Sequence, residues 1–253
     1  MKNFKGKAIY NPSGKAGEYS YWACNFYVWC SNGCEYCYCK KGILSGVMGQ
    51  DKPQLKKCFK DEEDALASFE KELVQNLHKL QQYGIFFSFT TDPMLPETIG
   101  LTQRAIRICF MNMVPVKVLT KCTDWVDPML NELVKNDTLW NLDWTYKHLL
   151  AIGFTLTGHD ELEPGASTNA ERIQAMKSLS SEGFKTWTSI EPIINFHDSL
   201  EMIKQSNFYC DLFKIGLESG KKYYSLALRD WIEDDRDFEI ENVAFWTEID
   251  NPF

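Results

Sequence analysis

Residues 23–37 read ACNFYVWCSNGCEYC and contain four of the nine cysteines of the chain. The first half, Ala23–Trp29, is rich in aromatic and apolar residues, which is typical of a buried strand. The second half places Cys30, Cys34 and Cys37 in the spacing C-x3-C-x2-C. The stretch therefore predicts a strand that leads directly into a loop carrying three thiols.

The cysteines of the chain are unevenly distributed. Five of the nine lie close together, and they are Cys24, Cys30, Cys34, Cys37 and Cys39. The other four are scattered, and they are Cys58, Cys109, Cys122 and Cys210. A disulfide scaffold usually spreads its cysteines through a small secreted chain. The clustering instead favours a metal site.

Three interpretations of this site remain open from the spacing. A structural zinc ion needs four ligands, and Cys39 or Cys24 could supply the fourth. Zinc ribbons usually use two separated cysteine pairs, however, and there is no second C-x2-C. Simple clustering of buried cysteines is the second interpretation. The third is a 4Fe–4S cluster held by Cys30, Cys34 and Cys37, with one iron left open.

Beyond this loop, short apolar runs alternate with helical patterns. The predicted strands are Ala23–Trp29, Gly84–Thr90, Val114–Thr120, His148–Thr155, Phe184–Ile190 and Cys210–Ile215. The predicted helices are Asp61–Leu80, Glu97–Met113, Asp127–Lys135, Asn169–Glu182 and Asp198–Gln205. This alternation implies parallel strands joined by right-handed crossovers. Six units predict an α/β fold, a partial (β/α)6 TIM-type barrel.

Composition limits the class of protein. The chain has 253 residues, of which 44% are hydrophobic and 25% charged, so global disorder is excluded. We expect one domain over residues 1–253, with a core of about 20–216 and an acidic, aromatic extension over 217–253. No apolar run is long enough to span a membrane, and the N-terminus lacks the apolar region of a secretory signal, which predicts a cytoplasmic protein. The net charge of −8 argues against a nonspecific polyanion binder, although a local basic groove would escape this sum.

The segment Asn25–Tyr38 resembles the cluster loop of the radical S-adenosylmethionine (SAM) superfamily, including an aromatic residue, Tyr36, just before the third cysteine. The resemblance implies a partial barrel with one 4Fe–4S cluster on Cys30, Cys34 and Cys37. It also implies that SAM binds the open iron and is reductively cleaved to a 5′-deoxyadenosyl radical, which abstracts a hydrogen atom from a substrate.

Between Asn11 and Gly216 the chain is similar to the spore photoproduct lyase-like branch of that superfamily. The matching pieces beyond the loop are Phe89–Asp92, Val118–Lys121, Glu163–Ala166 with Arg172, and Glu191–Ile193. They end or follow strands, where a parallel barrel builds its site. By this resemblance Thr91, Lys121 and Arg172 are candidate cofactor-binding residues, and Thr155 or Thr157 is a candidate for a similar part. Their positions at strand ends add Asp92 and Glu191 to the candidates, and the cysteine loop adds Tyr36 and Tyr38. For Asp92 a turn-forming role is the alternative, and for Arg172 a solvated helix charge.

One position departs from the family pattern. Spore photoproduct lyase has a hydrogen-donating cysteine just before the segment that matches Thr90–Asp92, and this chain has Phe89 there. A phenyl ring cannot donate a hydrogen atom as a thiol can. Cys122 is therefore a candidate donor, with a buried packing role as the alternative.

These observations give one leading hypothesis and two alternatives. The leading hypothesis is a radical SAM enzyme in nucleic-acid lesion repair or modification, reduced by an electron donor such as flavodoxin or ferredoxin. Modification of a peptide or a small molecule is the second hypothesis. A zinc-stabilised, non-catalytic nucleic-acid binding module is the third.

Overall fold

The computed structural model describes residues 4–41, 45–48, 50–135 and 144–217. A seven-stranded sheet with the strand order β1-β2-β5-β6-β7-β8-β9 forms its centre. The strands are β1 (Ile9–Tyr10), β2 (Ala23–Cys24), β5 (Ile85–Phe87), β6 (Val116–Thr120), β7 (Leu150–Thr155), β8 (Lys185–Ile193) and β9 (Leu212–Leu217). All neighbours from β2 to β9 pair in parallel, and β1 adds an antiparallel edge. The six parallel strands confirm the predicted partial TIM-type barrel.

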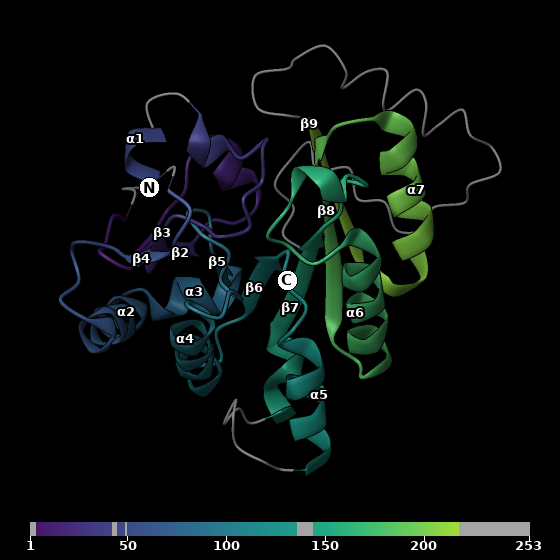
Figure 1. Ribbon diagram of the computed structural model, residues 1–253. Helices are drawn as coiled ribbons and strands as arrows, with labels where there is room; N and C mark the ends of the chain where they lie inside the picture. Colours follow the sequence, from purple (N-terminus) through teal and green to yellow (C-terminus); the bar gives the residue numbers. More distant parts are fainter. Residues whose placement is uncertain (1–3, 42–44, 49, 136–143, 218–253) are drawn as a thin grey trace.

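Helices connect the strands and, apart from the short helix Ser45–Met48 beside the cysteine loop, lie along the outer side of the sheet (Figure 1). They are α1 (Ser45–Met48), α2 (Glu62–Gln75), α3 (Leu77–Tyr83), α4 (Ile99–Met111), α5 (Val126–Lys135), α6 (Asn169–Ser181) and α7 (Phe196–Ser206). Asp61 accepts a hydrogen bond from the Asp64 amide at the start of α2, and Thr168 forms a capping box with Glu171 at the start of α6. Such caps satisfy amides that have no partner inside a helix.

Two predicted elements differ from the structure. The strand expected over Ala23–Trp29 is divided, because the chain leaves the sheet after β2 and pairs again as β3 (Tyr27–Val28) with β4 (Gln54–Leu55). At the bend, Asn25 donates to the Tyr10 hydroxyl and accepts from the Phe89 amide. The helix expected over Asp61–Leu80 is two helices, since Asn76 leaves helical geometry between α2 and α3.

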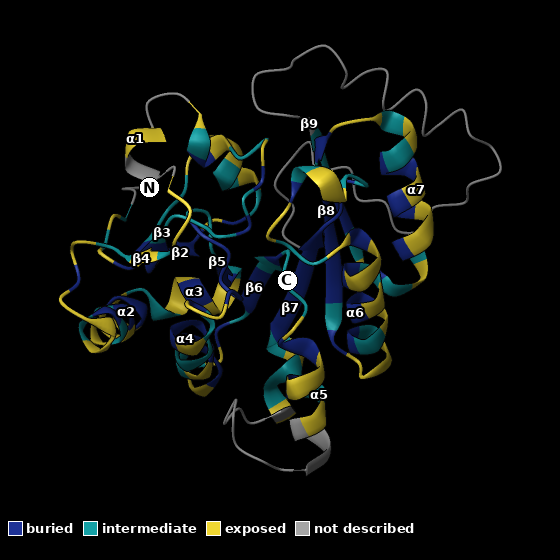
Figure 2. Ribbon diagram, in the orientation of Figure 1, coloured by how far each residue is buried: buried dark blue, intermediate teal, exposed yellow. Residues whose placement is uncertain are grey.

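Successive side chains of a strand point to opposite faces of the sheet, so apolar side chains pack in two layers, one on each face. On β6, Val116 and Val118 belong to the large core between sheet and helices, whereas Leu119 packs inside the barrel. Figure 2 shows the strands and the sheet-facing sides of the helices as buried, with exposed residues on the outer sides. Burial of each large apolar side chain contributes on the order of 2 kcal/mol, so these layers hold the strand ends in place.

The inner layer is small and aromatic. Its buried members are Ala23, Phe86, Ala151 and Trp187, and Tyr19 and Phe89 pack on them. The short side chain of Ala151 and the absence of one at Gly153 leave room for the Trp187 indole, which crosses the barrel interior. The interior above this tryptophan is thereby left open towards the carboxyl ends of the strands.

No helix in the described ranges combines the length and the apolar character that a membrane crossing requires. The predicted extension over 217–253 lies outside the described residues except for Leu217, which ends β9.

Candidate functional site

The cysteine loop follows β3 and is held against the segment that follows β7. The Glu35 amide donates to the Leu162 carbonyl at 2.9 Å, and the Gly165 amide donates to the Asn32 carbonyl at 3.0 Å. Gly33 has φ = 72°, and a Cβ atom there would lie 3.2 Å from Pro164 Cγ. Glycine is therefore suited to this position both by conformation and by the close approach of the two segments.

Cys30, Cys34 and Cys37 line one cavity with a volume of about 730 Å³. Burial raises the pKa of the Cys30 thiol to about 12, and burial also raises the pKa of Cys34 although the Lys121 ammonium opposes this. A hydrogen bond from the Cys39 thiol lowers the pKa of Cys37 to about 6.

Within the described ranges, no three His, Cys, Asp or Glu side chains converge closely enough to hold a single metal ion. A cluster makes a different demand, because each thiolate binds a different iron and the ligands stand further apart. The donor set of three soft thiols on one loop, opening into one cavity, fits such a group. The structure offers no ready-made four-ligand zinc site among the described residues.

The same cavity collects most of the predicted cofactor-binding residues. Those that line it are Tyr36, Tyr38, Thr91, Asp92, Lys121, Thr155 and Glu191. The hydroxyl oxygen of Thr91 is buried and has no hydrogen-bond partner among the described residues. An unsatisfied polar atom in a cavity wall is costly unless a ligand or water completes it. This atom therefore fits a site that binds a polar ligand.

Asp92 joins the cysteine loop to the end of β6. Its carboxylate accepts from the Asn32 amide group at 2.8 Å, from the Thr120 hydroxyl at 2.7 Å and from the Lys121 backbone amide at 2.8 Å. It also accepts from the Met94 amide at 3.0 Å, the Asx contact that the residue type suggests. Asp92 is thus a structural link as well as part of the cavity wall.

Behind the cavity, Glu163 holds three predicted residues together. Its carboxylate lies 2.6 Å from Arg172 Nη2 and 3.9 Å from Lys121 Nζ, and Tyr36 donates its hydroxyl proton to it. Burial lowers the pKa of Lys121, but the nearby Cys34 and Glu163 raise it by more, so the net shift is upward. Lys121 also lies over the Tyr36 ring, 5.6 Å from its centroid. The ammonium is therefore held protonated at the cavity wall.

Three predicted residues lie away from the cavity lining. Arg172 is fully buried and donates to the Thr155 carbonyl at 2.8 Å, so it braces β7 from behind. Thr157 is also fully buried, and its hydroxyl accepts from the His159 amide at 3.2 Å. The Cys122 thiol points at Asn32 and Asp92, with sulfur–oxygen distances of 3.6 and 3.7 Å. The hydrogen-donor role of Cys122 remains a prediction, without support from its position.

The opposite wall of the cavity comes from the N-terminal segment Ser13–Tyr19, which contains none of the predicted site residues. Glu191 at the end of β8 accepts from the Tyr19 hydroxyl at 2.6 Å, from Lys15 at 2.9 Å and from Lys214 at 3.0 Å. Lys214 was detectable, since it alternates with Leu212 and Gly216 on the inner face of β9. Nothing in the sequence around Lys15 and Tyr19 indicates a partner on a strand near the other end of the chain.

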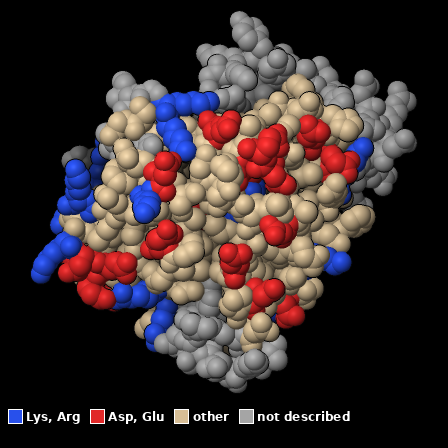
Figure 3. All heavy atoms as spheres, in the orientation of Figure 1, with Lys and Arg blue, Asp and Glu red and all other residues tan. Residues whose placement is uncertain are grey.

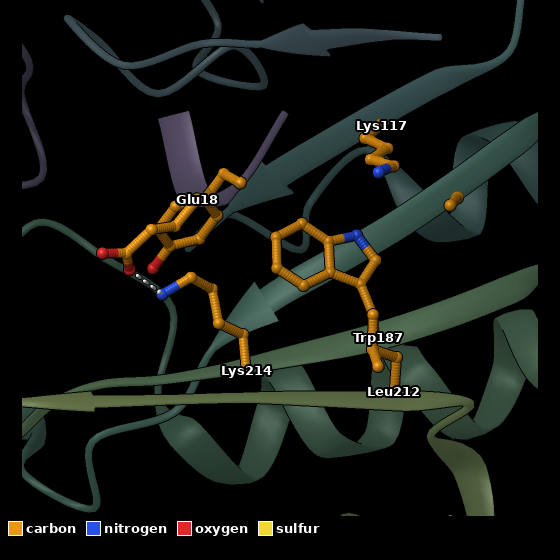
Figure 4. Close-up of a pocket in the computed structure, with 7 residues that line it drawn as sticks. Glu18, Lys117, Trp187, Leu212 and Lys214 are labelled. Carbon is orange, nitrogen blue, oxygen red and sulfur yellow. Dashed lines mark hydrogen bonds and ion pairs between the residues drawn. The ribbon is translucent and has the colours of Figure 1, made fainter. Parts of the chain in front are cut away.

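Trp187 is part of the floor of the barrel interior. A Cβ atom on Gly153 would lie 2.1 Å from the indole Cε2, so only glycine permits this position. Below the indole is a small void of about 20 Å³ lined by Lys117, Leu212 and Lys214 (Figure 4). Burial lowers the pKa of Lys117 to about 8. The Glu18–Lys214 ion pair, at 3.4 Å, closes one side of this void.

Comparison with known proteins supports the fold. The structure is similar to that of spore photoproduct lyase complexed with dinucleoside spore photoproduct, with a TM-score of 0.63 and 15% sequence identity. The match covers 93% of this chain and 66% of that one. No protein-family model and no curated protein matches the chain. At this identity the likeness establishes a shared fold.

Proposed function

We propose that this chain is a radical SAM enzyme that binds a 4Fe–4S cluster through Cys30, Cys34 and Cys37. The single observation that carries the proposal is the position of these cysteines. They open into one large cavity at the carboxyl edge of a six-stranded parallel half-barrel whose fold is shared with spore photoproduct lyase. The cluster and SAM would together supply a 5′-deoxyadenosyl radical for hydrogen abstraction.

We assign different roles in binding SAM to the residues around the cysteines. Lys121 is the residue we assign to an anionic group of the cofactor, because its charge is retained in a buried wall. The Thr91 hydroxyl, which has no hydrogen-bond partner among the described residues, is the hydrogen-bonding group that we assign next to Lys121. Asp92 positions both Asn32 of the loop and the backbone of Lys121. Arg172 acts through Glu163, which keeps Tyr36 and Lys121 in place.

Charge supports nucleic acid as the substrate class. Residues 1–60 contain ten lysines and three acidic residues, although the whole chain has a net charge of −8. Figure 3 shows Lys and Arg side chains along the left margin, over the N-terminal elements labelled in Figure 1, with acidic side chains beside them. Local positive charge of this kind is the usual electrostatic footprint for phosphodiesters. The similar structure contains a dinucleoside spore photoproduct, which agrees with this class. Modification of a peptide or small molecule is the second candidate.

The experiment is anaerobic reconstitution with iron and sulfide, followed by SAM and dithionite, with 5′-deoxyadenosine as the product measured. The wild type should form it, and Cys34→Ala should lose both the visible iron–sulfur absorption and the product. Cys58→Ala is the matched control, because Cys58 is exposed and lies outside the loop. Equal product in both variants would contradict the proposal. Retention of zinc instead of iron, with no product, would favour the non-catalytic binding module.

A further inference from the structure

Residues Ser13–Tyr19, here called the N-terminal strap, link opposite edges of the sheet. They leave from β1 at one edge and reach β8 and β9 at the other. The strap contains a 3-10 helix, Gly14–Glu18, and its members Ser13, Lys15, Ala16 and Tyr19 line the cavity that holds the three cysteines. A barrel of six strands is open where eight would close it, and the strap crosses that opening.

The strap is fastened by side chains from three directions. Tyr19 donates to Glu191 at 2.6 Å, lies 3.0 Å from the Ser189 hydroxyl, and packs its ring on Phe86, Phe89 and Trp187. Lys214 lies over the Tyr19 ring at 4.1 Å and pairs with both Glu191 and Glu18. Gly216 makes room for the Glu191 carboxylate, since a Cβ there would lie 2.8 Å from its Cδ. Glu191 is therefore the centre of the fastening.

This fastening determines where Lys15 is held. Its ammonium lies 2.9 Å from Glu191 at the cavity wall, and its side chain remains 44% exposed. Glu191 pairs with both Lys15 and Lys214, which holds the Lys15 ammonium at the cavity wall.

The charged side chains that line the cavity also favour an anionic ligand. Four lysines line the cavity, and they are Lys15, Lys40, Lys41 and Lys121. Its two carboxylates, Asp92 and Glu191, are already engaged by the protein. Lys15 is the lysine that lies on the strap, across the cavity from the cysteine loop.

We propose that the strap is the substrate-recognition element of this cavity, with Lys15 as the contact for an anionic group of the substrate and Glu191 as the residue that positions it. The inference rests on the proposed function only in that the substrate reacts in this cavity. The proposal predicts that the cavity binds a substrate with a phosphate or carboxylate group near Lys15 more tightly than an uncharged analogue, whatever reaction the substrate then undergoes.

The test compares two probes of nearly equal size, a dinucleoside monophosphate and its uncharged methylphosphonate analogue. Affinities are measured by equilibrium dialysis on the full chain, before and after anaerobic reconstitution. The wild type should bind the charged probe about tenfold more tightly, the scale of one charge-assisted contact. Lys15→Met should remove most of that preference with little change for the uncharged probe, and Lys15→Arg should keep it. Lys52→Met, an exposed lysine outside the cavity, is the matched control.

Each outcome decides the inference. A wild type without preference, an equal loss for both probes in Lys15→Met, or the same loss in Lys52→Met would overturn it. Formation of 5′-deoxyadenosine, measured separately without either probe, reports on the proposed function. Preference without product would leave the strap inference standing and defeat the enzyme proposal, whereas product without preference would do the reverse.

Discussion

The cysteine loop and the N-terminal strap form facing walls of one cavity, and they are held in different ways. The loop is fixed by backbone hydrogen bonds to Leu162 and Gly165 and by the buried Asp92 carboxylate. The strap is fixed by ion pairs and aromatic contacts that converge on Glu191. The loop wall is specified by a local motif, whereas the strap wall depends on side chains far apart in the sequence. The two walls should therefore respond to different substitutions.

The largest expected effect is on the loop side. Arg172→Met leaves the buried Glu163 carboxylate without the ion pair at 2.6 Å, and such a loss costs about 3–5 kcal/mol. We expect the free energy of unfolding, measured by urea denaturation, to fall by about that amount, and amide exchange in the cysteine loop to increase. The double variant with Glu163→Gln should recover part of the loss. A change below about 1 kcal/mol would contradict this view of the loop wall.

The fold and the loop wall could be predicted from the sequence to a greater extent than the strap wall. The six parallel strands and the convergence of Cys30, Thr91 and Lys121 on one cavity could be predicted, because strand ends of a parallel sheet meet at one edge. The division of Ala23–Trp29 could not, since it depends on how Asn25 bonds to Tyr10 and Phe89.

The strap was missed for the same physical reason. Lys15 and Glu191 are 176 positions apart, and no periodicity connects a short 3-10 segment with a strand end that far along the chain. Arg172 was assigned to the cofactor from a motif alone, whereas the structure pairs it with Glu163 behind the wall. A motif thus indicates which residues gather, but the tertiary contacts decide which of them face the cavity.

The second prediction concerns Trp187, which forms part of the cavity floor and contacts the strap but not the loop in the contacts described above. Gly153→Ala places a methyl group where the Trp187 indole lies, with a contact of 2.1 Å if nothing moves. Overpacking of this kind costs about 1–3 kcal/mol. Because Tyr19 packs on Trp187, the displaced indole should loosen the strap more than the loop. Hydrogen exchange resolved by segment measures this, and equal changes in both walls would argue against separate fastening.

The smallest effect depends on pH. Burial alone would raise the pKa of Glu191, but Lys214, Tyr19 and Lys15 outweigh it, and the pKa of Glu191 lies below the usual 4.5. A carboxyl group whose pKa is lower in the folded state stabilises that state above its unfolded value and loses this contribution as the pH falls through the folded value. Glu191→Gln should therefore lower the free energy of unfolding at pH 7. The difference from wild type should shrink below about pH 4.5, which thermal unfolding from pH 7 to about pH 3 would reveal.

Glu18→Gln is the control, because Glu18 is half-exposed and Lys214 retains Glu191, so its effect should stay within about 0.5 kcal/mol. A constant difference across the range would show that Glu191 acts through packing rather than charge, and the strap would then resemble the loop in how it is held.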